Sequence, residues 1–137
     1  MRIKKVLIIS FGSIGKRHLK IIKQIRPEIK INLLRREIPL KQSKEEKELV
    51  DKTFNNFQEA INDGADAAIV SSPAKFHIEH SLEILKANIP LFIEKPISDN
   101  LNKCLILKEL AKRKNSLITV GYVLRHSLIL NKFQKII

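Results

Sequence analysis

The sequence has one cysteine, four histidines and no hydrophobic run long enough to cross a membrane. A single thiol, Cys104, excludes a disulfide framework and a cysteine metal site, and it is typical of a reducing compartment. No two histidines have a metal-binding spacing that a third ligand supports, so we predict no metal site. A transmembrane helix needs about 20 apolar residues, and no segment approaches that length. We therefore expect a cytoplasmic protein with no membrane partner.

The chain also has no internal repeat and no low-complexity linker. Its 137 residues fit one domain, and its composition, 44% hydrophobic and 29% charged, is ordinary for a soluble globular protein. A second domain does not fit into this length. The sequence therefore predicts a single globular domain.

Acidic residues are scarce, since 26 lysines and arginines face 14 aspartates and glutamates, for a net charge of +12. Such an excess favours anionic partners, so a nucleic-acid-binding domain is one hypothesis. The lysines, however, are scattered over the polar positions of several predicted helices, and there is no arginine-rich arm. A solvated, lysine-rich surface explains the charge better, and we predict no nucleic-acid partner.

Short apolar runs alternate along the chain with longer segments of helical period. This alternation is the pattern of βαβ units in a parallel sheet that is buried on both faces. The pattern predicts an α/β fold, a doubly wound parallel sheet of the Rossmann type in a single domain. We expect strands at residues 5–10, 29–35, 50–54 (weak), 66–71, 90–94 and 116–120, and helices after residues 13, 43 and 56 and over 74–88 and 99–114.

Two of these helices have apolar positions from which we predict the buried side. In the helix over 74–88, Ile78, Ser81, Leu82 and Leu85 are expected to be buried. In the helix over 99–114, the residues expected to face inward are Leu101, Cys104, Leu105 and Leu110.

A glycine-containing turn, Ser10 to Gly15, comes directly after the first buried strand and opens a helix. It is a degenerate copy of the dinucleotide-binding fingerprint, in which Ser10 replaces the first glycine and makes the tight turn with a Cβ present. A helix that begins here directs unpaired backbone N–H groups at one spot, which suits a pyrophosphate. Gly12 would let the phosphates approach, and Gly15 would let the helix pack against the strand. An ordinary strand-to-helix turn is the alternative.

Two arginines, Arg35 and Arg36, end the second strand, about twenty residues beyond the glycine turn. NAD-binding sites usually have an Asp or Glu there, which binds the ribose hydroxyls, whereas a guanidinium pairs with a 2′-phosphate. The sequence therefore favours NADP over NAD. Two solvated arginines, with Glu37 supplying the acid, are the alternative.

The strands ending near 71 and 94 are followed by further candidate site residues. Ser71, Ser72 and Pro73 lie at the sheet edge where ligands of such folds bind, and His77 lies on the next helix, either as a site residue or as a packing residue. Glu94-Lys95-Pro96 follows the next strand. Because burying an ammonium demands a partner, an interior Lys95 at this edge indicates a role in moving the proton of a substrate hydroxyl.

The segment after the last strand, from Tyr122 to Ile137, ends in an apolar helical pattern. It is either the start of a connection to a further domain or a terminal helix that docks on the sheet. We assign residues 1–121 to the NAD(P)-binding domain and 122–137 to the start of the connection to a missing C-terminal domain.

Together these motifs resemble the N-terminal domain of the Gfo/Idh/MocA family, named after glucose-fructose oxidoreductase and inositol dehydrogenase. Residues 10–18 are similar to its Gly-x-Gly-x-x-Gly-x-x-His opening, and Ser72-Pro73 with His77 is similar to its Thr-Pro-Asn-x-x-His segment. Residues 94–96 match its Glu-Lys-Pro signature, and Gly121-Tyr122 with Arg125 is similar to its Gly-Tyr-x-x-Arg-Phe strip. This sequence departs from the patterns at Ser10, Ala74 and His126.

The resemblance implies a Rossmann domain that binds NADP, or NAD, in an oxidoreductase that transfers hydride at a hydroxyl carbon of a sugar, cyclitol or polyol. It implies catalytic roles for Lys95 and Glu94. The implied cofactor-binding residues are Ser10, Gly12, Ser13, Ile14, Gly15, Arg35, Arg36, Ser71, Ser72, Pro73, His77, Glu94, Lys95 and Arg125.

Members of the family continue into a second α/β domain, which supplies most substrate contacts and usually the oligomer interface. We therefore expect a sugar or polyol partner only where a second domain completes the site, and no oligomer of this chain alone. A non-catalytic nucleotide-binding module or a truncated gene product is the alternative to an enzyme.

Overall fold

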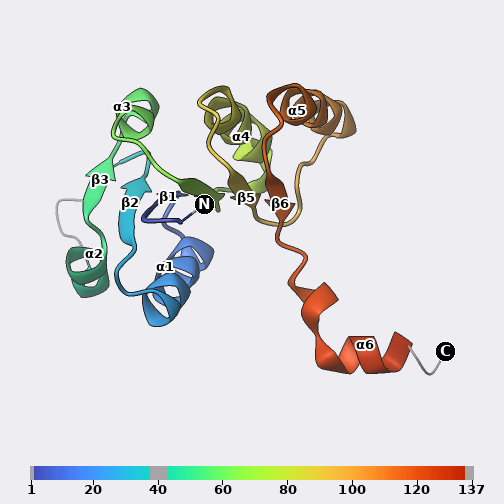
Figure 1. The fold of residues 1–137 in the computed structure, drawn as a ribbon, viewed down its shortest axis with the longest axis horizontal. Helices are drawn as coiled ribbons and strands as arrows, with labels where there is room; N and C mark the ends of the chain where they lie inside the picture. Colours follow the sequence, from blue (N-terminus) through green and yellow to red (C-terminus); the bar gives the residue numbers. More distant parts are fainter. Residues whose placement is uncertain (1, 38–42, 135–137) are drawn as a thin grey trace.

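The computed structural model describes residues 2–37 and 43–134. Within them, six parallel strands form one sheet in the order β3-β2-β1-β4-β5-β6 (Figure 1). This is the strand order of a Rossmann fold. The order in which strands are added to the sheet reverses between β1 and β4, although all the strands run parallel. The strands are β1 (Lys5–Ile9), β2 (Lys30–Leu34), β3 (Lys52–Phe54), β4 (Ala67–Val70), β5 (Leu91–Ile93) and β6 (Ile118–Val120).

Helices cover both faces of the sheet, which confirms the predicted doubly wound architecture (Figure 1). One face carries α1 (Ser13–Ile25) and α2 (Lys44–Leu49), and the other carries α3 (Phe57–Asn62), α4 (His77–Lys86) and α5 (Leu101–Lys114). Three shorter or peripheral elements complete the described chain: η1 (Ala74–Phe76), η2 (Val123–His126) and α6 (Leu128–Gln134). None of the helices within 2–37 and 43–134 has the length and apolar character needed to cross a membrane.

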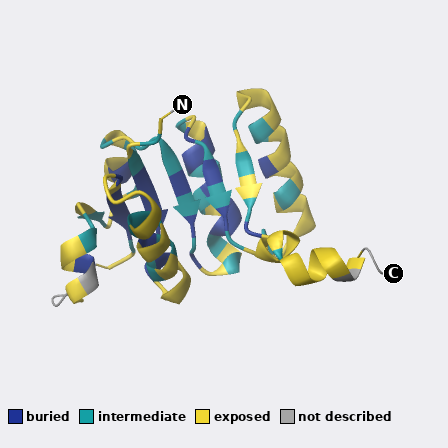
Figure 2. Cartoon of the chain, turned by 60° about the horizontal axis from the view of Figure 1, so that its bottom comes forward, coloured by how far each residue is buried: buried dark blue, intermediate teal, exposed yellow. Residues whose placement is uncertain are grey.

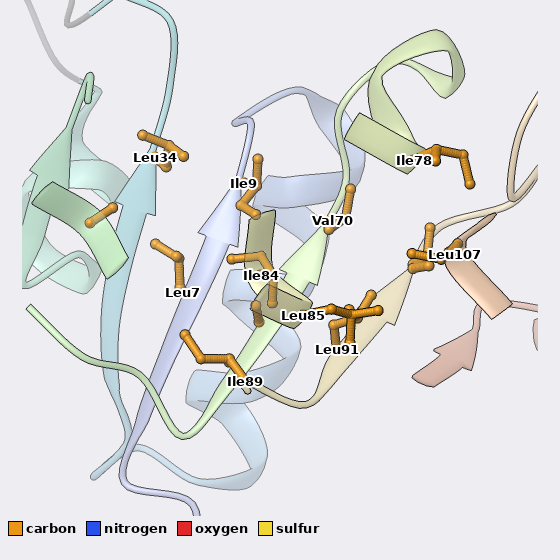
Figure 3. Close-up of a cluster of buried hydrophobic side chains, with 13 residues drawn as sticks. Leu7, Ile9, Leu34, Val70, Ile78, Ile84, Leu85, Ile89, Leu91 and Leu107 are labelled. Carbon is orange, nitrogen blue, oxygen red and sulfur yellow. The ribbon is translucent and has the colours of Figure 1, made fainter. Parts of the chain in front are cut away.

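The core lies on both sides of the central strands because their side chains alternate between the faces. In β1, Leu7 and Ile9 belong to the cluster under α3, α4 and α5, whereas Val6 and Ile8 belong to the cluster around Leu19 of α1. Figure 3 shows the first cluster between the strands and α4, and Figure 2 shows the same strands as the buried centre of the molecule. Burial of each such side chain contributes about 1.5 to 3 kcal/mol.

Aspartates bind the beginnings of the strands, at the sheet edge opposite the glycine turn. Asp66 accepts hydrogen bonds from the backbone N–H groups of Lys4 and Lys5 at 2.8 and 2.9 Å. Asp63 accepts from the Lys5 ammonium at 2.8 Å, from the Asn32 amide at 2.9 Å and from Lys52. These hydrogen bonds, that of Lys5 first, hold the pKa of Asp63 well below its usual range. The ionised carboxylate therefore stabilises the fold.

Replacing Asp63 with Asn is expected to lower the free energy of unfolding at pH 7 and to change it less at pH 3. The folded carboxyl has the lower pKa, so its contribution is complete above about pH 4, the unfolded value, and is lost as the pH falls toward the folded value. Urea denaturation of both proteins at the two pH values tests this. A difference that stays the same at pH 3 would show that the charge of Asp63 is not what stabilises the fold.

The inward residues predicted for α5 were partly wrong. Leu101 and Leu105 are 75% and 51% exposed, whereas Leu107 is buried. This helix packs on α4 near the end of the sheet along one narrow stripe, with Cys104 and Leu107 in the core cluster. Because residues 105–107 are all apolar, the helical periodicity is compatible with more than one buried side. Packing in the folded protein buries the side with Leu107.

The burial predicted for α4 is confirmed at Ile78, Ser81 and Leu85, and Leu82 is half-buried. The helix begins at residue 77 because residues 74–76 form the 3₁₀ turn η1.

The alternative in which the terminal helix docks on the sheet is wrong for the described residues. Figures 1 and 2 show α6 beyond the sheet, with its surface exposed. Leu128 and Ile129 are 78% and 80% exposed. The division of the chain at residue 121 stays a prediction.

Candidate functional site

The turn between β1 and α1 has the conformation that the fingerprint requires. Ser10 has a φ of 74°, in the left-handed region that glycine usually occupies, and its N–H donates to the Leu34 carbonyl at 2.7 Å. Gly12 is the N-cap of α1, and no side chain caps the helix start. A Cβ built on Gly12 meets nothing within 4 Å. The start of α1 therefore has no side-chain cap and is open at Gly12, as phosphate binding requires.

Gly15 is where the helix and the turn come closest. A Cβ there would lie 2.4 Å from the Ser10 carbonyl oxygen and 3.0 Å from the Ser71 Oγ. The Ser71 hydroxyl lies within donor distance of the carbonyls of Ile9 and Ser10, at 3.0 and 3.1 Å. Ser71 thus supports the turn from the side of the sheet. The prediction that it contacts a cofactor stays untested.

A cleft of about 620 Å³ opens at the carboxyl ends of β1, β2 and β4, next to this turn. This is the crevice at the topological switch point, where such sheets bind ligands. Five of its lining residues were predicted from the sequence: Ser10, Arg35, Arg36, Ser72 and Pro73. A smaller cavity of about 400 Å³ lies beside it and is lined by Ser10, Phe11, Gly12, Arg35, Arg36 and Glu37.

Sequence reasoning missed the aromatic wall of the cleft. The His80 ring lies between Phe57 and Phe76, with ring centroids 5.5 and 5.8 Å away, and its Nδ1 is 2.9 Å from the Ser72 Oγ. Burial lowers the pKa of His80, so the ring is neutral at neutral pH. Asn55 and Glu79 also line the cleft. The position of Asn55, directly after β3, was a usable signal, because the carboxyl ends of parallel strands share one edge.

The two arginines at the end of β2 have different surroundings. The Arg35 Nη1 donates to the Glu46 carboxylate on α2 at 2.9 Å, and the Arg35 guanidinium lies 6.0 Å from the Phe11 ring centre. Arg36 is exposed at the cleft. An anion that enters the cleft would therefore meet Arg36 first.

Glu94 and Lys95 lie at the end of β5. The Glu94 Oε1 bonds the His18 Nε2 of α1 at 2.7 Å, and its Oε2 accepts from the Lys95 N–H at 3.2 Å. A Cβ at Gly121 would lie 2.9 Å from the Phe92 ring and 3.3 Å from the Glu94 Oε2, so the Phe92 ring would have to move to admit a larger residue. The prediction of an interior Lys95 was wrong, because its side chain is exposed. Strand β5 ends at Ile93, so Lys95 lies in the loop beyond it, where water reaches the ammonium.

His77 is buried and joins two loops of the site. Its Nδ1 lies 2.8 Å from the Pro96 carbonyl oxygen, and its Nε2 lies 2.6 Å from that of Ser72. The ring therefore connects the loop after β4 with the loop that contains Lys95. Contact between His77 and a cofactor stays a prediction.

Arg125 lies in η2, beyond β6, and is not one of the residues that line the cleft. Its guanidinium is 5.8 Å from the Tyr122 ring centre. The structure therefore does not bring Arg125 together with the other predicted cofactor-binding residues.

Comparison with known proteins agrees with this geometry. The family described as "Oxidoreductase family, NAD-binding Rossmann fold" matches residues 4–122. The chain belongs to the Gfo/Idh/MocA family. Glucose-6-phosphate 3-dehydrogenase of Bacillus subtilis is 28% identical over 98% of this chain, which spans 38% of that protein. The family's NAD-binding fold thus extends through β6.

Solved structures share the fold. Myo-inositol 2-dehydrogenase of Lactobacillus plantarum has a TM-score of 0.86 at 22% identity, with 98% of this chain and 41% of that chain covered. Scyllo-inositol dehydrogenase of Lactobacillus casei, solved with NAD(H) and scyllo-inositol, has a TM-score of 0.84 at 21% identity, with 98% and 40% covered. This Gfo/Idh/MocA chain therefore spans about two fifths of the length of these relatives.

Proposed function

We propose that this chain binds NADP, and NAD more weakly, as the coenzyme domain of an oxidoreductase that acts at a hydroxyl carbon of a sugar, cyclitol or polyol. The open glycine turn carries the proposal. Ser10 adopts the left-handed conformation, no side chain caps α1, and the space at Gly12 is free. These three features fit a pyrophosphate and are not needed by a purely structural turn.

The residues present suit both ends of such a coenzyme. The amides of Ser13, Ile14 and Gly15 would bind the pyrophosphate, and the aromatic wall would contact the adenosine. When bound, NAD(P) supplies the acceptor or donor of the hydride. The exposed Lys95 side chain would take the proton of the reacting hydroxyl as the neutral amine, and would return it in the reverse direction as the ammonium. Glu94, fixed by His18, would hold the backbone of Lys95 in place.

The preference for NADP rests on the end of β2. Arg36 stands at the position where an acid would repel a 2′-phosphate, and its exposed side chain has no carboxylate partner among the described residues. A sugar phosphate or an inositol is the substrate class suggested by the names of the relatives. The cytoplasmic location, the lack of a nucleic-acid or membrane partner and the monomeric state stay predictions.

Titration of the purified chain with NADPH and with NADH, followed by coenzyme fluorescence, tests the proposal. We expect saturable binding of both, with NADPH bound more tightly. In an Arg36→Ser variant the affinity for NADPH should fall about tenfold, a change of about 1.4 kcal/mol, while the affinity for NADH changes little. No binding of either coenzyme at millimolar concentration would refute the proposal.

A non-catalytic coenzyme-binding module is the second candidate. The exposed position of Lys95, outside the residues that line the cleft, favours it. Bound coenzyme without dehydrogenase activity on a panel of sugars and polyols would support it. Turnover on addition of a partner chain would reject it.

A further inference from the structure

The side chain of Glu46 is buried against Arg35, although it is not among the residues that line the cleft. It is 4% exposed and accepts a hydrogen bond from the Arg35 Nη1 at 2.9 Å. The Arg35 side chain is 24% exposed and lies over the Phe11 ring. Ser43 caps the helix that carries Glu46, with its Oγ accepting from the Glu46 N–H at 3.3 Å. This carboxylate is thus held in place at the end of β2.

The ion pair with Glu46 neutralises Arg35 and not Arg36. Arg35 and Arg36 both line the two cavities, but Arg35 shares its charge with a carboxylate that water barely reaches. Screening by salt is weak for such a buried pair. Arg36 is exposed, and the structure gives it no carboxylate partner among the described residues. An incoming phosphate would meet one available cation and one that is already neutralised.

We propose that Glu46 limits the preference of this chain for NADP by neutralising Arg35. The inference rests on the proposed function, since it concerns the same cleft. A 2′-phosphate carries negative charge and is repelled by the Glu46 carboxylate behind Arg35, whereas a 2′-hydroxyl is neutral and is not. Glu46 therefore weakens the binding of NADPH and leaves the binding of NADH nearly unchanged.

A Glu46→Gln variant tests this directly. Glutamine has the same shape, and its amide oxygen still accepts from Arg35, but the charge is removed. The matched control is Glu48→Gln on the same helix, because Glu48 is 58% exposed and pairs with Lys44 at 3.8 Å, away from the arginines. Circular dichroism and thermal unfolding establish that each variant is folded.

We expect Glu46→Gln to bind NADPH at least about fivefold more tightly than the wild type, with NADH affinity within about twofold. Glu48→Gln should resemble the wild type for both coenzymes. The inference would be overturned if Glu46→Gln bound NADPH no more tightly than Glu48→Gln does. It would also be overturned if Glu46→Gln changed the affinities for NADPH and NADH by the same factor.

A second variant tests the neutralisation without leaving either charge unpaired. The double variant Arg35→Gln, Glu46→Gln is expected to change NADPH binding by less than about threefold, because it removes both charges of a pair whose charges cancel. A loss of tenfold or more would show that Arg35 binds the phosphate in spite of Glu46 and would overturn the inference. If the wild type binds neither coenzyme, the proposed function fails and the inference fails with it. If the wild type binds both and Glu46→Gln changes nothing, the inference alone fails.

Discussion

A Gly12→Ala variant is expected to fold as the wild type does and to lose most of its affinity for the coenzyme. The position is open, since a Cβ meets nothing within 4 Å, and its φ of −71° suits any residue. The free energy of unfolding should therefore change by no more than about 1 kcal/mol, the effect of alanine at an N-cap. The added methyl group takes the space in which a phosphate would approach the amides. We expect the Kd for NADPH to rise at least about tenfold.

A Gly15→Ala variant should behave differently, because its Cβ would lie 2.4 Å from a backbone oxygen, that of Ser10. The backbone must move to relieve this overlap, at a cost of about 1 to 3 kcal/mol. Both stability and binding should fall. Thermal denaturation and NADPH titration of the two variants side by side separate the roles of the two glycines. Normal NADPH binding by Gly12→Ala would contradict the assignment of the turn.

Replacing His77 with Phe is expected to destabilise the fold by about 1 to 3 kcal/mol. The ring is 1% exposed, and its nitrogens lie next to the carbonyl oxygens of Ser72 and Pro96. Phenylalanine fills a similar volume but removes the ring N–H, so the carbonyl oxygen that accepts from it loses its donor, and an unpaired buried group costs about 1 to 3 kcal/mol. The loop that contains Lys95 loses its connection to β4. Hydrogen exchange of that loop should therefore become faster.

His80→Phe is the matched control for this prediction. Its ring lies between two aromatic rings, contacts that Phe keeps, and Phe loses only the one hydrogen bond with the Ser72 hydroxyl at the cleft. We expect a loss of less than about 1 kcal/mol. Chemical denaturation of both variants measures the difference. Equal effects would mean that the two carbonyl contacts of His77 do not hold the site together.

Much of the fold could be predicted from the sequence because parallel strands covered on both faces have nearly continuous apolar runs. Val6 to Ile9 form such a run, and the structure places β1 at the centre of the sheet. The left-handed Ser10 was also predictable, since the turn requires that conformation whatever residue occupies it. The buried side of α5 was not predictable, because residues 105–107 are all apolar and tertiary packing decides which of them is buried.

The site was only partly predictable, because several of its contacts join residues far apart in the sequence. Glu46 on α2 bonds Arg35 at the end of β2, and His18 on α1 bonds Glu94 after β5. No local spacing indicates these pairs. The exposure of Lys95 depends on where β5 ends, and the boundaries of elements are the least certain part of any prediction from sequence.

The central claim is that the backbone amides after β1 bind the diphosphate of a nicotinamide coenzyme. Amide chemical shifts of the ¹⁵N-labelled chain, recorded by NMR during a titration with NADPH, test it most directly. The account predicts that the largest shifts occur at Ser13, Ile14 and Gly15 and saturate together with those of Arg36. Unchanged resonances at these amides with saturating NADPH would contradict it.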